Sequence, residues 1–384
     1  ACRSSRPELE RLPSGEAVRC FHHQDAQRLS LIGSGAIPAT LDERAPAALH
    51  LQDVAISYRR PALLDKIIGR DGDHIPTVDG IEITIAKGET LGLVGESGSG
   101  KSTILKAIAG LLPPSAGKIT VADEGALAPN VEQRSPDHLR KIQLIFQNPD
   151  DSLNPRQTIA QILEQPLKLY FGLTGDALHQ RSADILDRVR LGAHYLDRLP
   201  SQLSGGEKQR VAIARAFAAE PDLVLCDEVT SALDVSVQAA VLDLLNDLKA
   251  TQGTTYVFVS HDLAVVRALS DRVAVLYQGR LCELGPSADV YSTPSHPYTE
   301  VLLGAVLEPD PDTAPTLSAD DVVELSPPAQ GCPFQRRCPR KVGPICDSDV
   351  PPWQYGADGH AIRCHHSIQD LEVAQSEDAE EQIA

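Results

Sequence analysis

The chain has 384 residues with 35 basic and 53 acidic side chains, and its formal net charge of −18 repels phosphate backbones, which argues against nucleic acid as a partner. At about 150 residues per domain, this length suggests two or three domains with enough apolar content for packed cores. No apolar run approaches the roughly 18 residues that a membrane-spanning helix needs, so membrane association would have to come through a partner.

The first segment of the chain is similar to a segment near its end. Cys2 and Cys20 are separated by 17 residues, and so are Cys346 and Cys364, at an offset of 344 residues. Flanking residues match at the same offset: Pro7 with Pro351, Gly15 with Gly359, Ala17 with Ala361, and Arg19 with Arg363. Coincidence between two polar stretches is the alternative. The self-similarity predicts that residues 1–23 are the tail of a preceding, duplicated unit.

The middle of the chain alternates between strand and helix patterns. Residues 24–48, rich in Ala, Ser, Gly and Pro, are expected to form a linker. Strands are predicted at 49–58, 81–86, 142–146, 223–226, 254–259 and 273–277, and a strand, a glycine loop and a helix within 89–112. Helices are predicted at 159–169, 178–190, 206–219, 235–250 and 263–269. This alternation predicts an α/β fold in which helices cover a largely parallel sheet.

A glycine-rich loop after the apolar residues 90–94 fits the phosphate-binding pattern G-x-x-x-x-G-K-[ST]. The loop consists of Gly95, Glu96, Ser97, Gly98, Ser99, Gly100, Lys101 and Ser102, and Thr103 continues into the predicted helix. Backbone N–H groups and the helix N-terminus would converge on a phosphate, whereas an ordinary glycine turn is the alternative. We expect Lys101 to reach the β- and γ-phosphates of ATP and Ser102 to ligate Mg²⁺.

An acidic pair follows the apolar strand predicted at 223–226. A carboxylate at the carboxyl end of a strand faces the crevice where open α/β sheets bind nucleotides, so Asp227 suits Mg²⁺ ligation. Glu228 can orient or deprotonate an attacking water, although acidic residues after strands are often only caps. Cys226 is expected to be a small buried side chain without chemistry.

A third motif consists of Leu203, Ser204, Gly205, Gly206 and Glu207, followed by Lys208, Gln209 and Arg210. With the two motifs above, it resembles the nucleotide-binding subunits of ATP-binding-cassette (ABC) transporters. A Ser-Gly-Gly helix start offers a hydroxyl, free N–H groups and a positive dipole end to an anion, although it could also be only a cap. In that family the anion is the γ-phosphate of an ATP held by a second nucleotide-binding domain.

The resemblance carries roles to four further residues. Tyr58 matches the aromatic residue that stacks on adenine, and Gln147 matches the glutamine that touches Mg²⁺ and water and links the site to the permease. Asp234 belongs to the loop that crosses the dimer interface, and His261 matches the switch histidine near the γ-phosphate. Glu228, His261 and Gln147 would then be catalytic, and Ser102, Gln147 and Asp227 would bind Mg²⁺.

One residue departs from the family pattern. Val229 stands where the family has Pro after the acidic pair, and we expect it to alter the local turn more than the chemistry. The resemblance implies a P-loop ABC-type nucleotide-binding domain at 49–306, built from a mixed sheet with helices and a helical subdomain at about 148–220. A small cysteine-rich C-terminal extension follows at 307–366, as a regulatory domain, and the acidic residues 367–384 are expected to be disordered.

The C-terminal residues resemble the tail of the oligopeptide and dipeptide importer ATPases. The resemblance rests on 295–299, on Leu302 and Leu303, and on 331–339. It implies an ATPase at the cytoplasmic face of the membrane, with two membrane-spanning permease subunits and an extracytoplasmic substrate-binding protein as partners. An importer of nickel or another small solute is one alternative. A DNA-repair or chromosome-associated ABC ATPase is another, but the 103 positions from Lys101 to Ser204 leave no room for a coiled-coil arm.

Four cysteines in this tail suit a metal centre. Cys332, Cys338, Cys346 and Cys364 are separated by five, seven and 17 residues. The reducing cytosol disfavours disulfides, and the paired knuckles of structural zinc are absent. A [4Fe–4S] cluster, known in some members of the subfamily, is therefore favoured, with zinc or free structural thiols as alternatives. The repeat would make Cys2 and Cys20 the last ligands of an upstream cluster, and the second nucleotide-binding domain part of the same polypeptide.

Overall fold

The computed structural model describes residues 10–11, 17–18, 46–58, 76–121, 125–231, 233–292, 295–304, 328, 330–356 and 359–383. The chain divides into two compact units, residues 1–40 and 41–384. In the first unit, β1 (Glu10–Arg11) and β2 (Ala17–Val18) form an antiparallel pair in which Glu10 lies opposite Val18 and Arg11 opposite Ala17. The expected linker at 24–48 lies outside the described residues up to residue 45.

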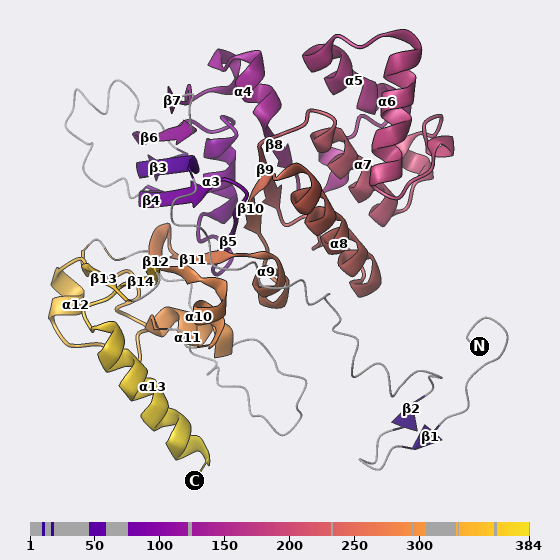
Figure 1. Cartoon of the computed structure of the whole chain (residues 1–384). Coiled ribbons are helices and arrows are strands. Elements are labelled where there is room, and N and C mark those ends of the chain that lie inside the picture. The colour runs from indigo at the N-terminus through magenta and orange to yellow at the C-terminus, as the bar shows by residue number, and fades with distance from the viewer. Residues whose placement is uncertain are drawn as a thin grey trace. The chain divides into compact units, whose positions relative to one another are not determined.

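The second unit is built around an eight-stranded mixed sheet in the order β13, β14, β12, β11, β5, β10, β9, β8 (Figure 1). The strands are β5 Thr90–Val94, β8 Ile142–Ile145, β9 Leu223–Asp227, β10 Thr255–Val259, β11 Arg272–Tyr277, β12 Arg280–Pro286, β13 Trp353–Tyr355 and β14 Ala361–Arg363. The run from β11 to β8 is parallel, whereas β12, β14 and β13 pair antiparallel. The parallel part has the arrangement expected from alternating strands and helices.

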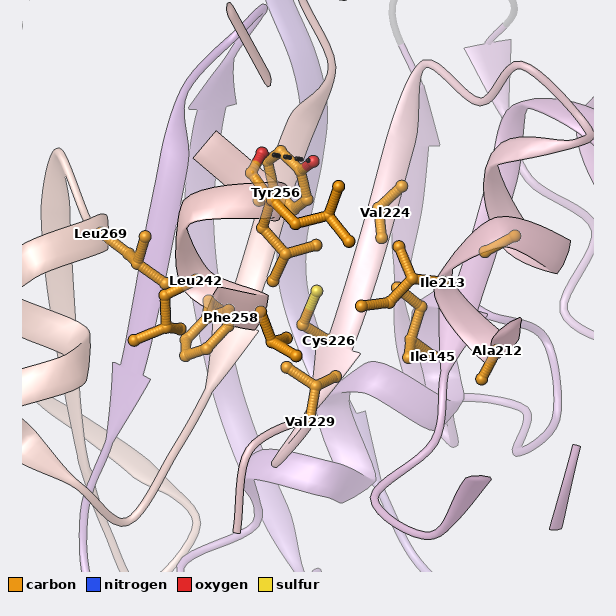
Figure 2. Close-up of a cluster of buried hydrophobic side chains, with 14 of the residues drawn as sticks. Ile145, Ala212, Ile213, Val224, Cys226, Val229, Leu242, Tyr256, Phe258 and Leu269 are labelled. Carbon is orange, nitrogen blue, oxygen red and sulfur yellow. Dashed lines mark hydrogen bonds between the residues drawn. The ribbon is translucent and has the colours of Figure 1, made fainter. Parts of the chain in front are cut away.

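Alternate residues along the central strands enter two different cores. Val224 and Cys226 of β9 pack into one core with helices α5 to α9, and Leu223 and Leu225 pack into the other with α3. Figure 2 shows Cys226 inside the first core, among apolar side chains that include Phe258. Because both faces of the central strands are buried, these strands are apolar at nearly every position. The expectation that Cys226 is a buried residue is confirmed.

A smaller antiparallel sheet covers the α3 side of the main sheet. Its order is β4, β3, β6, β7, with bounds β3 Ala47–Ile56, β4 Val78–Ala86, β6 Ala116–Val121 and β7 Gly125–Ala126. Residues Val78, Ile81, Ile83 and Ile85 of β4 are buried, and the residues between the last three are exposed. The sheet buries one face against α3 and leaves the other accessible.

The helices are α3 Lys101–Ile108, α4 Pro136–Lys141, α5 Ile159–Phe171, α6 Gly175–Arg188, α7 Gly205–Phe217, α8 Val235–Gln252, α9 Leu263–Leu269, α10 Ser287–Ser292, α11 Pro297–Gly304, α12 Ile345–Ser348 and α13 Ile368–Ile383. Short 3₁₀ turns lie at Val131–Gln133, Pro149–Asp151, Ala193–Tyr195 and Pro200–Gln202. The strands and helices predicted in chain order are confirmed, with ends that differ by at most three residues. No helix in the described part of the chain is long and apolar enough to cross a bilayer.

The structure of the C-terminal part differs from two expectations. Residues Ile368–Ile383 form α13 rather than a disordered tail, because Ser367 caps Asp370, Leu371 is buried, and Glu, Gln and Ala favour a helix. The described residues of 307–366 belong to the same compact unit as the main sheet and not to a separate domain. Strand β14 adds directly to β12, with Ile362 opposite Glu283.

Candidate functional site

The strand order brings four chain segments to one edge of the sheet. Strands β5, β10, β9 and β8 are neighbours and run parallel, so their carboxyl ends lie in a row. The glycine loop follows β5, His261 follows β10, Asp227 closes β9 and Gln147 follows β8. Side chains that are far apart in the sequence therefore gather at one place.

The glycine loop curls around its own lysine. Lys101 Nζ donates hydrogen bonds to the backbone oxygens of Gly95 and Glu96, each at 2.8 Å, and to Ser99 Oγ at 3.3 Å. Gly95 has φ of 146°, and a Cβ there would lie 2.1 Å from the backbone oxygen of Leu276, so only glycine fits. Burial lowers the pKa of Lys101, against the nearby carboxylates of Glu228 and Asp227, which favour its charge.

A hydroxyl and a carboxylate pair at the start of α3. Ser102 Oγ donates a hydrogen bond of 2.7 Å to Asp227 Oδ1. Burial raises the pKa of Asp227, and the hydrogen bond from Ser102 acts in the opposite direction. A buried carboxylate and a hydroxyl are the hard oxygen ligands that Mg²⁺ prefers, so the residues present fit this ion.

Two of the predicted catalytic side chains converge on one atom of the third, Glu228 Oε2. Gln147 Nε2 donates a hydrogen bond to it at 2.8 Å, and His261 Nδ1 lies 3.4 Å from it. Glu228 has φ of 47°, a strained conformation for a residue with a side chain. Its N–H donates to the backbone oxygen of Val259, and Ser231 binds its carbonyl oxygen through both N–H and Oγ, which fixes the strained turn. Val229 follows as a fully buried core residue.

Tyr58 lies near the start of α3 and is not a core residue. Its side chain is 59% exposed, and its hydroxyl is hydrogen-bonded to Thr103 Oγ1 at 3.1 Å. The contact places an exposed aromatic ring beside the first turn of α3.

Ser204 begins α7 with a capping box. Its Oγ accepts the N–H of Glu207, and Glu207 Oε2 accepts both the Ser204 N–H at 2.7 Å and its hydroxyl at 2.8 Å. The Tyr195 hydroxyl donates to Glu207 and, with Ser204, holds the pKa of that carboxyl at about 2. A Cβ on Gly206 would lie 2.4 Å from Val237 Cγ1, whereas Gly205 has open space.

The hydrogen bonds found for Ser204 and Asp234 are local to the helices that these residues begin. Among the hydrogen bonds of the described residues, none joins Ser204 or Asp234 to the loop or to Glu228. Asp234 is the N-cap of α8, and its Oδ1 accepts the N–H of Val237 at 3.0 Å. Ser204 and Asp234 therefore face solvent at two helix starts.

Two residues at the glycine loop are not indicated by any motif for nucleotide binding. Tyr298 and Arg337 both bind Glu96, the second residue of the loop. Both fall inside the C-terminal stretches 295–299 and 331–339, which is the only signal that the sequence gives for them.

The four C-terminal cysteines, Cys332, Cys338, Cys346 and Cys364, are free thiols that line one pocket. Burial raises the pKa of Cys332 to about 11 and that of Cys338 to about 12, and the neighbouring thiols of the group add to both shifts. The Cys332 N–H donates to the backbone oxygen of Cys346 at 2.8 Å. In the part of the chain that the structure describes, no three His, Cys, Asp or Glu side chains are arranged to hold a metal ion.

Comparisons with known proteins agree with this geometry. A family model described as "ABC transporter" matches residues 78–231, and one described as "Oligopeptide/dipeptide transporter, C-terminal region" matches 282–346. The probable peptide ABC transporter ATP-binding protein y4tS of Sinorhizobium fredii is 42% identical over 76% of this chain and 82% of its own. A putative peptide import ATP-binding protein of Brucella ovis is 42% identical over 75% of this chain and 90% of its own.

Solved structures show the same fold. The ATP-binding cassette MJ0796, in a dimeric post-hydrolysis state bound to ADP and Pi, superposes with a TM-score of 0.53 and 30% identity over 62% of this chain and 98% of its own. The cbiO1 protein of Clostridium perfringens, part of the ABC transporter complex cbiONQ, gives a TM-score of 0.53 and 26% identity over 64% and 91%. The fold and the site define an ABC-type ATPase. The chain belongs to the family of oligopeptide and dipeptide ABC transporter ATP-binding proteins, whose activity is ATP hydrolysis coupled to transport.

Proposed function

We propose that this chain is the ATP-hydrolysing subunit that powers the import of oligopeptides or dipeptides through a membrane permease. The observation that carries the proposal is the convergence of Gln147 and His261 on Glu228 Oε2, in a chain that also has the oligopeptide/dipeptide C-terminal region. The names of its relatives favour peptides over nickel or another small solute. They also disfavour a role in DNA repair.

The loop residues would bind the phosphates of ATP. Backbone N–H groups of residues 95–103 and the N-terminus of α3 offer donors, and Lys101 would exchange its bonds to Gly95 and Glu96 for the β- and γ-phosphates. Tyr58 would stack on the adenine. Ser102, Asp227 and Gln147 would hold Mg²⁺, which neutralises phosphate charge when bound.

Hydrolysis would be a matter of positioning. Glu228 would orient the attacking water and accept its proton, with its Oε2 held by Gln147. His261, 3.4 Å from the same oxygen, would contact the γ-phosphate. Attack would be in line with the leaving ADP oxygen, and these side chains would contribute by orienting the water and the γ-phosphate.

A second nucleotide-binding domain would complete the site. Ser204, Gly205, Gly206 and Glu207 of one domain would bind the γ-phosphate held by the other, and Asp234 would cross the interface. The exposed positive start of α7 supports this role. The closure of the two nucleotide-binding domains would be transmitted through the region of Gln147 to two permease subunits, at the cytoplasmic face of the membrane. An extracytoplasmic binding protein would deliver the peptide.

Reconstitution tests this function. The chain, its second domain and the cognate permease would be placed in proteoliposomes with the binding protein, and ATP hydrolysis would be measured with di- and oligopeptides or with Ni²⁺. Peptide-stimulated hydrolysis with accumulation of labelled peptide is the expected result. Stimulation by Ni²⁺ alone would contradict it.

We also propose that residues 1–23 derive from another cassette of the same polypeptide. The strand pairs support this: Glu10 with Val18 and Arg11 with Ala17 repeat, at the offset of 344, the pairs Gln354 with Ile362 and Tyr355 with Ala361 in β13 and β14. An immunoblot of the native polypeptide with an antibody against α13 tests the proposal. A product the size of a single cassette would overturn it.

The four C-terminal cysteines are proposed to hold a [4Fe–4S] cluster. All four thiols line one pocket and interact electrostatically. Among the described residues no side chains are arranged to hold a single metal ion, but a cluster is larger than one ion and needs thiols that lie farther apart. Cys2 and Cys20 would serve an upstream copy. Iron, acid-labile sulfide and zinc should be measured in anaerobically purified protein. Absence of iron and sulfide would remove this proposal and leave the ATPase function intact.

A further inference from the structure

Glu96 is held at four atoms, by two residues distant in the sequence and by Lys101. Its N–H donates a hydrogen bond of 2.9 Å to the Tyr298 hydroxyl oxygen. Its carboxylate accepts two hydrogen bonds from Arg337, at 2.9 Å each, in a bidentate pair. Its backbone oxygen accepts from Lys101. Together these contacts fix the orientation of the Glu96 backbone and side chain in the glycine loop.

Three aromatic rings hold the two distant residues in place. Tyr277 at the end of β11, Tyr298 in α11 and Phe334 in the cysteine-bearing segment form an aromatic cluster, with ring centroids 4.6 to 5.4 Å apart. The Arg337 guanidinium carbon lies 5.9 Å from the centroids of Tyr277 and Phe334. Tyr298 and Phe334 are fully buried, so their positions are fixed by packing.

The ion pair between Arg337 and Glu96 affects how the glycine loop can bind an anion. Glu96 places a negative carboxylate beside the segment whose N–H groups would receive phosphates. Unpaired, this charge would repel the bound triphosphate, because Coulomb repulsion between nearby like charges is considerable in a partly buried site. Arg337, whose side chain is only 16% exposed, neutralises the carboxylate and orients the peptide.

We propose that Arg337 and Tyr298 are positioning residues of the nucleotide site, through which residues 330–340 and α11 keep the glycine loop in its phosphate-binding form. The proposal rests on ATP binding by this loop, and it deepens that function by making the C-terminal region a structural part of the site. Neither residue touches the reacting atoms.

Arg337→Ala tests the ionic contact in the full chain. We expect the Kd for MgATP, measured by calorimetry, to rise roughly tenfold, because a partly buried carboxylate is left unpaired beside the phosphates. The KM for ATP should rise in step, while kcat at saturating ATP stays within about twofold, since binding and not chemistry is affected. Lys341→Ala removes the same charge from an exposed pair with Asp347 and is expected to leave the Kd unchanged.

The double variant Arg337→Ala with Glu96→Gln separates charge from general damage. Without the carboxylate there is nothing left to neutralise, so the double variant should bind MgATP more tightly than Arg337→Ala alone. Arg337→Lys, which keeps the charge and loses the bidentate geometry, should lie between wild type and Arg337→Ala. A double variant no better than Arg337→Ala would overturn the proposed role of the pair.

Tyr298→Phe tests the second contact without emptying the core. It removes only the oxygen that accepts the Glu96 N–H, and we expect a severalfold rise in Kd, of roughly three- to tenfold. Tyr256→Phe is the matched control, because it removes a buried tyrosine hydroxyl of the same core that donates to the Leu245 carbonyl oxygen and not to the glycine loop. Wild-type affinity in both Tyr298→Phe and Arg337→Ala would overturn the proposal, whereas failure of peptide import alone would not.

Discussion

Ser102 Oγ donates a hydrogen bond of 2.7 Å to Asp227 Oδ1, which joins the glycine loop after β5 to the end of β9 across the intervening strand β10. The contact is possible because three parallel strands end at the same edge of the sheet. It places a buried carboxylate next to the hydroxyl that would bind the same metal ion. Burial of this carboxylate is unfavourable for folding and useful for ion binding.

Asp227→Asn should therefore weaken Mg²⁺-dependent nucleotide binding and raise stability. Burial raises the pKa of Asp227 above its ordinary value of 3.8, so the folded state binds the proton more tightly, and stability is lost as pH rises through the folded pKa. At neutral pH without Mg²⁺, the variant should melt higher, by about 2–4 °C for each kcal/mol regained. A lower melting temperature in calorimetry would contradict this account.

Replacing the carboxylate on which Gln147 and His261 converge should separate binding from hydrolysis. Glu228→Gln keeps the shape of the side chain and loses the proton acceptor, so phosphate release should fall by about 100-fold or more while MgATP still binds. The control is Glu164→Gln, which removes a partly buried carboxylate paired with Lys168 on α5 and should hydrolyse ATP normally. Unimpaired turnover in Glu228→Gln would exclude the role given to Glu228.

A second carboxylate at Gln147 should change the pH dependence of the reaction. Gln147→Glu would place a second carboxyl group where Gln147 Nε2 lies 2.8 Å from Glu228 Oε2, and repulsion between the two negative charges raises the pKa at which the pair loses its second proton. The acidic limb of the kcat profile should then move to higher pH. Gln147→Ala loses the hydrogen bond without adding charge, so its activity should fall with no such movement; equal profiles for both variants would count against the contact.

The buried pair of His360 and Glu283 should make stability depend on pH. Burial alone would lower the pKa of His360, but the hydrogen bond and charge of Glu283, 2.6 Å away, raise it overall. The stability that this pair contributes is fully present below pH 6.5, the ordinary pKa of histidine. It is lost as the pH rises through the higher pKa that His360 has in the folded protein. Burial keeps the second histidine at Glu283, His296, neutral, with a pKa of about 4.

His360→Gln should accordingly lower the free energy of unfolding by about 1 kcal/mol more at pH 6 than at pH 9, as measured by urea unfolding. His179→Gln, on the exposed face of α6, is the control and should show no difference between the two pH values. An equal loss for His360→Gln at both pH values would show that the histidine acts only by packing.

Much of the nucleotide site could be predicted from the sequence because its motifs are local. The loop around Lys101 lies between its own strand and helix, and Asp227, Gln147 and His261 each follow an apolar strand. The sequence does not reveal the order of these strands in the sheet, and this order decides which of the side chains become neighbours. By contrast, the contact between Arg337 and Glu96 joins residues 241 positions apart, and no local pattern encodes such a distance.

Two missed elements have different physical causes. Strand β12 carries a buried charged residue, Glu283, which interrupts its apolar pattern, but Gln278 and Gly279 both have positive φ, 46° and 82°, which is the signature of a tight hairpin turn. That dipeptide was the available signal. Helix α13 was missed because its acidic composition resembles that of disordered tails, and the buried Leu371 near its start is a weak pattern.

The addition of β14 to β12 makes the C-terminal region inseparable from the catalytic fold. A chain shortened to end at Gly304, where the helix α11 finishes, would leave β12 as an open sheet edge with unpaired backbone groups and a buried Glu283 without its histidine. Open edges recruit strands from other molecules. Such a shortened protein would self-associate through β12, so the ATPase of this family member should be purified and assayed with its tail.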